Sequence, residues 1–303
     1  MKSLIALIRR EQIEHRAAFL YAPAIVLGLF AVTLAMTFAM NRMQVPLAVS
    51  GGSALKFFTI AFLFTGALWM TYLMMVLFFY FADAFNADRR NNAMLFWKSM
   101  PQSDFKILMS KLLAALTILP VQVFAAFILT GVVLYAATAA ATLVLPALAV
   151  PGVAETIGAA GQVLWFSAVY AVLALLWYAP FFAWVGALST VAGRWSIPLA
   201  FLIPGLVVLA ENLFVRGLGN LILPMDGMRG GQVLGYLRQR LTFGVDDHDM
   251  FERAMTTDAP VDVGGLLARF LAGIDWVQLG GGVIVAVLLV YIASEYRRRV
   301  VLT

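Results

Sequence analysis

The sequence predicts an all-α integral membrane protein with six transmembrane helices and both termini in the cytoplasm. Two observations indicate this fold class. Of the 303 residues, 63% are hydrophobic and only 12% are charged, whereas a soluble domain has about 25% charged residues. The apolar residues also gather in uncharged runs, several of them longer than the ~20 residues that a membrane-spanning helix needs. We therefore expect a single transmembrane domain over residues 1–303.

The spans follow from the positions of these runs. The uncharged stretch 112–154 is long enough for one span with a loop or for two tightly joined spans. Its Ala-rich end is interrupted by Pro146 and Pro151, which favours one span and a loop. The six predicted spans are 17–40, 57–82, one that begins near Leu112, one within 162–192, about 197–215, and 276–294.

The distribution of positive charge supports six spans over seven. Short cytoplasmic segments of membrane proteins are enriched in Lys and Arg. With six spans, the segments on the N-terminal side hold thirteen of these residues, and the opposite short loop holds two, Arg42 and Lys56. Seven spans would give nine against six. The thirteen are Lys2, Arg9, Arg10, Arg16, Arg89, Arg90, Lys98, Lys106, Lys111, Arg194, Arg297, Arg298 and Arg299.

Two further segments lie outside the predicted spans. In residues 1–16, three basic residues recur every seven positions and share one helical face, with apolar residues opposite. This pattern predicts an interfacial helix, and a solvated charged N-terminus is the alternative. Residues 216–275 form a predicted extracytoplasmic segment between the last two spans. Its apolar patches and Gly-rich turns predict short helices, with a re-entrant stretch as an alternative near 216–224.

Composition also excludes several kinds of chemistry. The chain has no Cys and only two His, so neither thiol catalysis nor a His-rich metal site is expected. It lacks the glycine-rich phosphate loop of an ATPase. The net charge of +5 is explained by the membrane rule and does not indicate nucleic acid. We predict no enzyme activity, cofactor or metal in this chain, so ATP and Mg²⁺ would have to bind to a partner.

Glu211 is the only carboxylate well inside a predicted span. Ionisable residues in spans are costly and usually face a cavity or a partner. Glu211 and its neighbour Asn212 are therefore candidates for a translocation path or gate. The alternative is that Glu211 lies at the outer headgroup level and pairs with Arg216.

The loop 83–111, between the second and third predicted spans, has the most distinctive composition. It is basic, and it contains the apolar sequence AMLFWKSM over residues 93–100. Asn91 or Asn92 can cap a short helix that Pro101 ends. Ser103 or Asp104 can cap the long helix that follows. The loop predicts a short helix across the ends of two spans.

The apolar side chains of this short helix allow two interpretations. They can fill a groove on a partner protein, with the basic residues setting the charge around it. They can equally rest in the membrane interface, where Trp is common. The residues concerned are Leu95, Phe96, Trp97 and Met100, with Arg89, Arg90 and Lys98 around them.

The order of these parts resembles the permease subunit of bacterial ABC transporters of the type-2 exporter family. Locally, the sequence ADRRNNAMLFWKSMPQSD over 87–104, with Ser110-Lys111 before the third span, is similar to that family. The matching positions are Asp88 to Arg90, Phe96 to Pro101, Ser103-Asp104 and Ser110-Lys111. The topological likeness covers the whole chain.

The resemblance implies a coupling helix at 91–100 that docks on a separate ATPase subunit. It also implies two permease subunits, as identical or homologous copies, that work with two ATPases in the bacterial inner membrane. ATP hydrolysis would drive alternating-access export, and the scarcity of charge in the spans favours an amphiphilic substrate. The expected ATPase contacts are Asp88, Arg89, Arg90, Asn91, Leu95, Phe96, Trp97, Lys98 and Met100. The competing hypotheses are a proton-coupled carrier that uses Glu211 and a non-transporting membrane sensor or scaffold.

Overall fold

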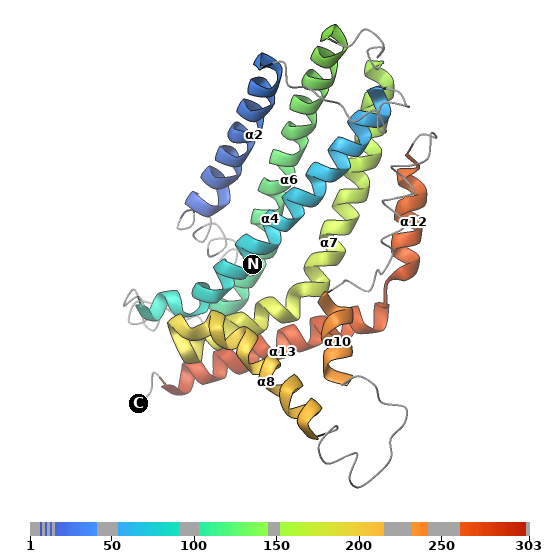
Figure 1. Ribbon diagram of the computed structural model, residues 1–303. Coiled ribbons are helices and arrows are strands. Elements are labelled where there is room, and N and C mark those ends of the chain that lie inside the picture. Colours follow the sequence, from blue (N-terminus) through green and yellow to red (C-terminus); the bar gives the residue numbers. More distant parts are fainter. Residues whose placement is uncertain are drawn as a thin grey trace, which may run out of the picture. The chain divides into compact units, whose positions relative to one another are not determined.

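The computed structural model describes residues 16–40, 54–90, 103–144, 152–214, 232–241 and 261–300, together with Leu7, Arg10 and Ile13 (Figure 1). All regular structure in these ranges is helical. Within them, four stretches are long and apolar enough to cross a membrane. These are Ala54–Phe85, Asp104–Ala141, Val153–Leu213 and Trp276–Arg299, and Ala22–Thr37 and Val263–Gly273 are shorter apolar helices. The predicted all-α, membrane-compatible character is confirmed.

Several helices extend beyond their predicted spans. The helix of the second predicted span begins at Ala54 and continues to Arg90. The helix of the third predicted span runs without a break from Asp104 to Val144 and includes Pro120. The described elements are η1 Ala17–Tyr21, α2 Ala22–Ala39, α4 Ala54–Arg90, α6 Asp104–Val144, α7 Val153–Ala192, η2 Gly193–Trp195, α8 Ser196–Leu213, α10 Gln232–Leu241, α12 Val263–Gly273 and α13 Trp276–Val300. The short helices α10 and α12 both lie within 216–275, where the sequence predicts short helices.

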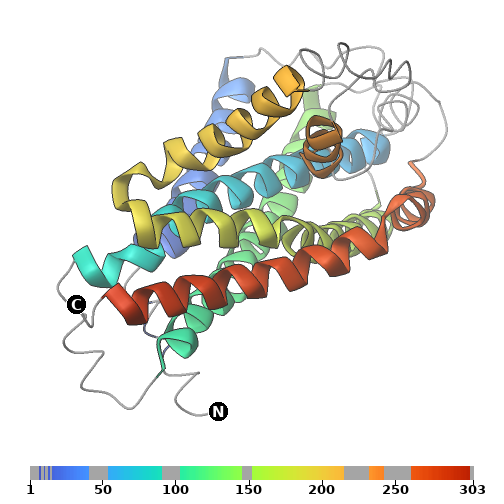
Figure 2. The ribbon, with the colours of Figure 1, turned by 90° about the horizontal axis from the view of Figure 1, so that it is seen from below.

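A single turn separates α7 from α8. Gly193 has φ 55°, a left-handed conformation that glycine adopts without a steric penalty. One turn of 3-10 helix, η2, follows, and α8 begins at Ser196. At this turn the chain changes direction, and α8 leads back from it (Figure 2). The 61-residue apolar stretch Val153–Leu213 is therefore two helices joined by a tight turn.

The chain divides into two compact units. The first unit contains Met1–Val76, Leu113–Leu173 and Asp247–Ala272. The second unit contains Leu77–Leu112, Ala174–Asp246 and Gly273–Thr303. Because the boundaries fall within α4, α6 and α7, these three helices contribute residues to both units.

Ring packing between α4 and α6 forms the core of the first unit. Phe62 stacks on Phe127 with ring centroids 4.4 Å apart. Gly131 allows this packing, because a Cβ at that position would lie 2.7 Å from the Phe62 ring. About two turns further along α4, the Trp69 Nε1 donates a hydrogen bond of 2.9 Å to the hydroxyl of Thr130, the residue before Gly131. Close backbone approach at small residues is typical of helix pairs in membranes.

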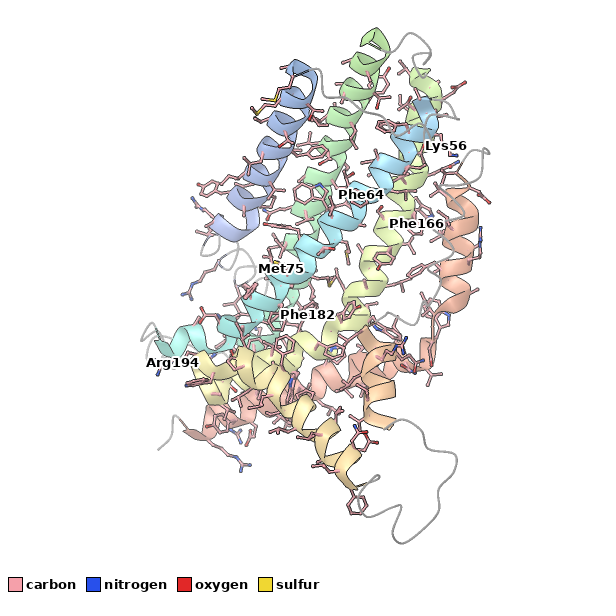
Figure 3. All side chains as sticks on the ribbon, viewed as in Figure 1. Lys56, Phe64, Met75, Phe166, Phe182 and Arg194 are labelled. Carbon is pink, nitrogen blue, oxygen red and sulfur yellow. The ribbon has the colours of Figure 1, made fainter. Side chains whose placement is uncertain are left out.

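The helix α12 packs on α7 within the same unit. Its buried residues Val263, Leu266 and Phe270 recur every three or four positions and form one apolar face. The Phe270 ring lies 5.1 Å from the Tyr170 ring and 6.2 Å from the Phe166 ring. Phe166 projects from α7 on the side that carries α12 (Figure 3).

In the second unit, the last part of α4 packs against the last part of α7. Phe81 stacks on Phe182 with centroids 5.6 Å apart. Gly186 lies against Phe85, whose ring a Cβ would approach to 2.9 Å. The start of α8 joins this core through the Ser196 hydroxyl, which donates a hydrogen bond of 2.9 Å to the Ala82 carbonyl.

Candidate functional site

Most of the predicted ATPase contacts lie outside the described residues. These are Asn91, Leu95, Phe96, Trp97, Lys98 and Met100, so the predicted coupling helix itself is outside the described ranges. The backbone of Asp88, Arg89 and Arg90 forms the last turn of α4. The structure thus describes the two helix ends that flank the loop, and both belong to the second unit.

The helix end after the loop is capped by Ser103. Its hydroxyl accepts a hydrogen bond of 3.3 Å from the backbone N–H of Lys106. Its carbonyl accepts one of 3.1 Å from the N–H of Ile107. A serine that accepts from the third residue of a helix is a standard N-cap. Of the two predicted caps, Ser103 is therefore the one that the structure uses, and Asp104 becomes the first residue of α6.

Asp104 joins the start of α6 to the end of α13. Its Oδ1 lies 3.3 Å from the Nε of Arg297, whose side chain is only 5% exposed. Beside this ion pair, the ring of Phe105 lies 6.2 Å from that of Tyr291. Removing one partner of a buried ion pair leaves an uncompensated charge. The pair therefore fixes the position of the α6 terminus that follows the loop.

This end of the second unit is rich in positive charge. The ends of α4 and α13 and the turn between α7 and α8 lie on the same side in both ribbon views (Figures 1 and 2). Arg194 marks the turn (Figure 3). On these elements and the start of α6, the cations are Arg89, Arg90, Lys106, Lys111, Arg194, Arg297, Arg298 and Arg299, and the carboxylates are Asp83, Asp88, Asp104 and Glu295. This excess of cations is what short cytoplasmic segments carry.

The basic residues at this end are held in two ways. Lys111 is 2% exposed, so its side chain is buried in the second unit. The Glu295 carboxylate accepts hydrogen bonds of 2.9 Å from Arg298 and 3.0 Å from Arg299, both on the solvent side of α13. Exposed pairs of this kind contribute little stability. The outer arginines therefore remain available as surface charge.

Glu211 caps the short helix α10. Its carboxylate oxygens accept the backbone N–H of Val233 at 3.0 and 3.3 Å. The first N–H groups of a helix have no partner within the helix, and a negative charge there is stabilised by the helix dipole. Arg216, the alternative partner, lies outside the described residues. The neighbouring Asn212 donates a hydrogen bond of 2.9 Å to the Val208 carbonyl of its own helix.

The helix α10 itself carries a charged residue, Arg240, that is more deeply buried than Glu211. Arg240 is 3% exposed, and its guanidinium carbon lies 4.4 Å from the centre of the Trp177 ring. Its Nε donates to the Tyr236 hydroxyl at 3.1 Å, and its Nη1 to the Trp177 carbonyl at 3.3 Å. Its Nη2 donates to the Gln278 carbonyl. One side chain thus contacts α7 and α13 from α10.

The backbone at the end of α10 is held by α7. The Trp177 Nε1 donates a hydrogen bond of 2.8 Å to the Arg240 carbonyl, and the Tyr178 hydroxyl donates one of 2.8 Å to the Leu241 carbonyl. On α13, a Cβ at Gly282 would lie 2.7 Å from the Arg240 Nη2. Space for the guanidinium therefore depends on a glycine at that position.

The sequence contains little that could have identified Arg240. It is one of six arginines in the segment 216–275, most of which reads as a soluble loop. The only local signal is Tyr236, four residues earlier and on the same helical face. The other contacts come from residues 63 and 38 positions away in the chain.

The chain matches no protein-family model, no curated protein and no solved structure. Across the described ranges, no group of three or more His, Asp or Glu side chains could hold a metal ion.

Proposed function

We propose that the chain is the membrane permease subunit of an ATP-driven ABC exporter of the type-2 family. It would act in a bacterial inner membrane, with a second permease and two ATPase subunits, on an amphiphilic substrate. The observation that supports this most is the sequence over 87–104, in which a basic stretch is followed by an aromatic sequence and then by the capped start of a long helix. The chain contains no phosphate loop, so a partner would bind ATP and Mg²⁺.

The described helices support a six-span arrangement within this proposal. The tight turn at Gly193 divides the longest apolar stretch into α7 and α8. Together with α2, α4, α6 and α13, these make six apolar helices in the expected order. The excess of cations at the ends of α4 and α13 and at the turn before α8 favours a cytoplasmic position for that side.

The contacts of the second unit suggest how a docked loop would transmit motion. The loop is continuous with α4 on one side and with α6 on the other. Because Asp104 pairs with Arg297, a displacement of the loop would reach α13 as well as α6. Because Ser196 bonds to Ala82, the end of α4 would carry α8 with it. ATP binding could thus act on four helices through one loop, provided that the docked contacts differ between two states.

A pull-down experiment tests the docking loop. The proposal expects an ATPase gene beside the gene for this chain, and co-expression should yield a complex of the two proteins. The double variant Phe96→Glu with Trp97→Glu should lose the ATPase, because two buried apolar contacts would become charged. The control is Trp276→Glu, an exposed Trp at the start of α13. Full retention of the ATPase by the double variant would refute the docking role.

The two competing hypotheses make different predictions. A proton-coupled carrier would transport without ATP and lose activity in Glu211→Gln. The hydrogen bonds from Val233 give Glu211 a structural task, which does not favour this alternative. A non-transporting sensor or scaffold would not stimulate a partner ATPase. ATPase activity that rises when the reconstituted permease is added would argue against it.

A further inference from the structure

Arg240 carries a buried guanidinium whose described hydrogen-bond partners are all neutral. Burying a cation is costly unless it is paired, and buried charges in proteins are normally compensated. Among the described residues, no carboxylate forms an ion pair with Arg240. Its acceptors are two backbone carbonyls and a phenol hydroxyl, all neutral. Two carboxylates of this region serve as helix caps instead: Glu211 accepts the N–H of Val233 at the start of α10, and Asp275 accepts the N–H of Gln278 at the start of α13.

The guanidinium also has hydrogen-bonding capacity left. It carries five N–H groups, and three of them are used, by Tyr236, Trp177 and Gln278. One N–H on Nη1 and one on Nη2 remain. Two N–H groups on one edge of an arginine can pair with the two oxygens of a phosphate or carboxylate, and this bidentate geometry is strong and specific.

Access to this group runs past Tyr236. The Tyr236 side chain is 50% exposed, and its hydroxyl accepts the Nε–H of Arg240. One hydrogen-bond partner of the buried guanidinium therefore reaches the surface.

Exposed apolar residues are chain neighbours of Arg240 and of its partner Gln278. Leu241 follows Arg240 in the chain and is 64% exposed, and Val277 precedes Gln278 and is 85% exposed. A hydrocarbon tail would find apolar surface next to the charged group.

We infer that Arg240 recognises the oxyanion of an anionic amphiphile at the junction of α7, α10 and α13. The oxyanion takes the two unused N–H groups, the Trp177 ring holds the guanidinium plane in place, and the apolar tail lies over Leu241 and Val277. This inference does not depend on the proposed ATP-driven transport, because it concerns binding to the isolated chain.

Calorimetry on the full chain in neutral detergent tests the site. The probes are dihexanoyl phosphatidic acid, inorganic phosphate and, as a control without net charge, dihexanoyl phosphatidylcholine. We expect phosphatidic acid to bind, and Arg240→Gln to weaken it about 10-fold or more, as expected for loss of a charge-assisted pair. The matched control is Arg238→Gln on the same helix, which is exposed and should leave the affinity unchanged.

A second variant separates recognition from a purely structural role. Tyr236→Phe removes the hydroxyl that accepts the Nε–H and so frees a third N–H group for the oxyanion, and we expect binding to tighten about 3-fold. If Arg240 only holds the helices together, no such gain in affinity is expected. Arg240→Lys, which keeps the charge and loses the planar fork, should weaken binding and gives a usable variant if Arg240→Gln does not fold.

The outcomes are distinct. Phosphate binding that also needs Arg240 identifies the oxyanion itself as the ligand, and binding of phosphatidic acid alone identifies an amphiphile. Either result supports the site. The inference is overturned if no probe binds, if Arg240→Gln and Arg238→Gln have equal affinity, or if Arg240→Lys and Tyr236→Phe both bind like the unchanged chain.

Discussion

The contacts inside the first compact unit differ in kind from those inside the second. In the first unit, rings pack against glycine and against each other, as Phe62 does with Gly131 and Phe127. In the second, polar side chains also reach the backbone of other helices, as Ser196 does with Ala82 and Arg240 with Gln278. Ring packing specifies shape, whereas polar contacts can exchange one partner for another. The second unit is therefore the better place for a part that responds to a ligand or a motor.

The largest expected effect is in the first unit. Gly131→Leu would place a side chain where even a Cβ lies 2.7 Å from the buried Phe62 ring. We expect a loss of about 3 kcal/mol in the free energy of unfolding, at the upper end for overpacking. The control is Gly158→Leu, because a Cβ at Gly158 meets nothing within 4 Å. Thermal unfolding in detergent measures both, and equal melting temperatures would contradict the packing argument.

The next effect concerns the ion pair between α6 and α13. Asp104→Asn leaves the buried Arg297 without this carboxylate, and we expect a loss of about 2 kcal/mol. The matched variant Glu295→Gln breaks exposed pairs with Arg298 and Arg299 and should not shift the unfolding midpoint. Denaturation at two salt concentrations compares them. If both variants behave alike, burial does not distinguish the two pairs.

A smaller effect compares one hydrogen bond from each unit. Trp69→Phe removes the bond to Thr130, and Ser196→Ala removes the bond to the Ala82 carbonyl. Each should cost about 1 kcal/mol. Only Ser196→Ala should also reduce ATPase stimulation in the reconstituted complex, because it loosens α8 from α4. A drop in stimulation with both variants would show that the two units do not differ in this respect.

The smallest effect on stability is expected at Gly282. Gly282→Ala places a Cβ 2.7 Å from the Arg240 Nη2, and the long arginine side chain can move aside. We expect a loss below about 1 kcal/mol, because a flexible side chain yields more easily than a packed ring. The affinity for dihexanoyl phosphatidic acid should nevertheless fall several-fold. Gly281→Ala, with nothing within 4 Å of its Cβ, is the control, and equal affinities would contradict the proposed geometry.

The sequence predicts helix type and order well because both depend on local pattern. Long uncharged runs gave the apolar helices, and the choice between Ser103 and Asp104 was the only uncertainty at the start of α6. Helix ends were predicted less well: α4 continues to Arg90 because the residues after 82 include the good helix formers Ala84, Ala87, Arg89 and Arg90.

The candidate site was predicted unevenly for the same reason. The loop 83–111 carries a local motif, so the sequence is sufficient to single it out. Glu211 was identified from its unusual place in an apolar run, but its partner, Val233, lies 22 residues away and leaves no local signal. Arg240 depends on Trp177, Gln278 and Gly282, which share no periodicity with it. Contacts between distant segments are set by tertiary packing, which a single sequence does not encode as a readable pattern.

The contacts of Arg240 also have a consequence for the order of synthesis. Trp177, Tyr178 and Glu211 have already been made when the ribosome reaches α10, but Gln278 and Gly282 come later. Until α13 is in place, the guanidinium lacks one of its carbonyl partners and the cover that this helix provides. A chain that stops before Trp276 would therefore expose a cation and an aromatic face together, a feature by which quality-control proteases could distinguish an incomplete chain from a finished one.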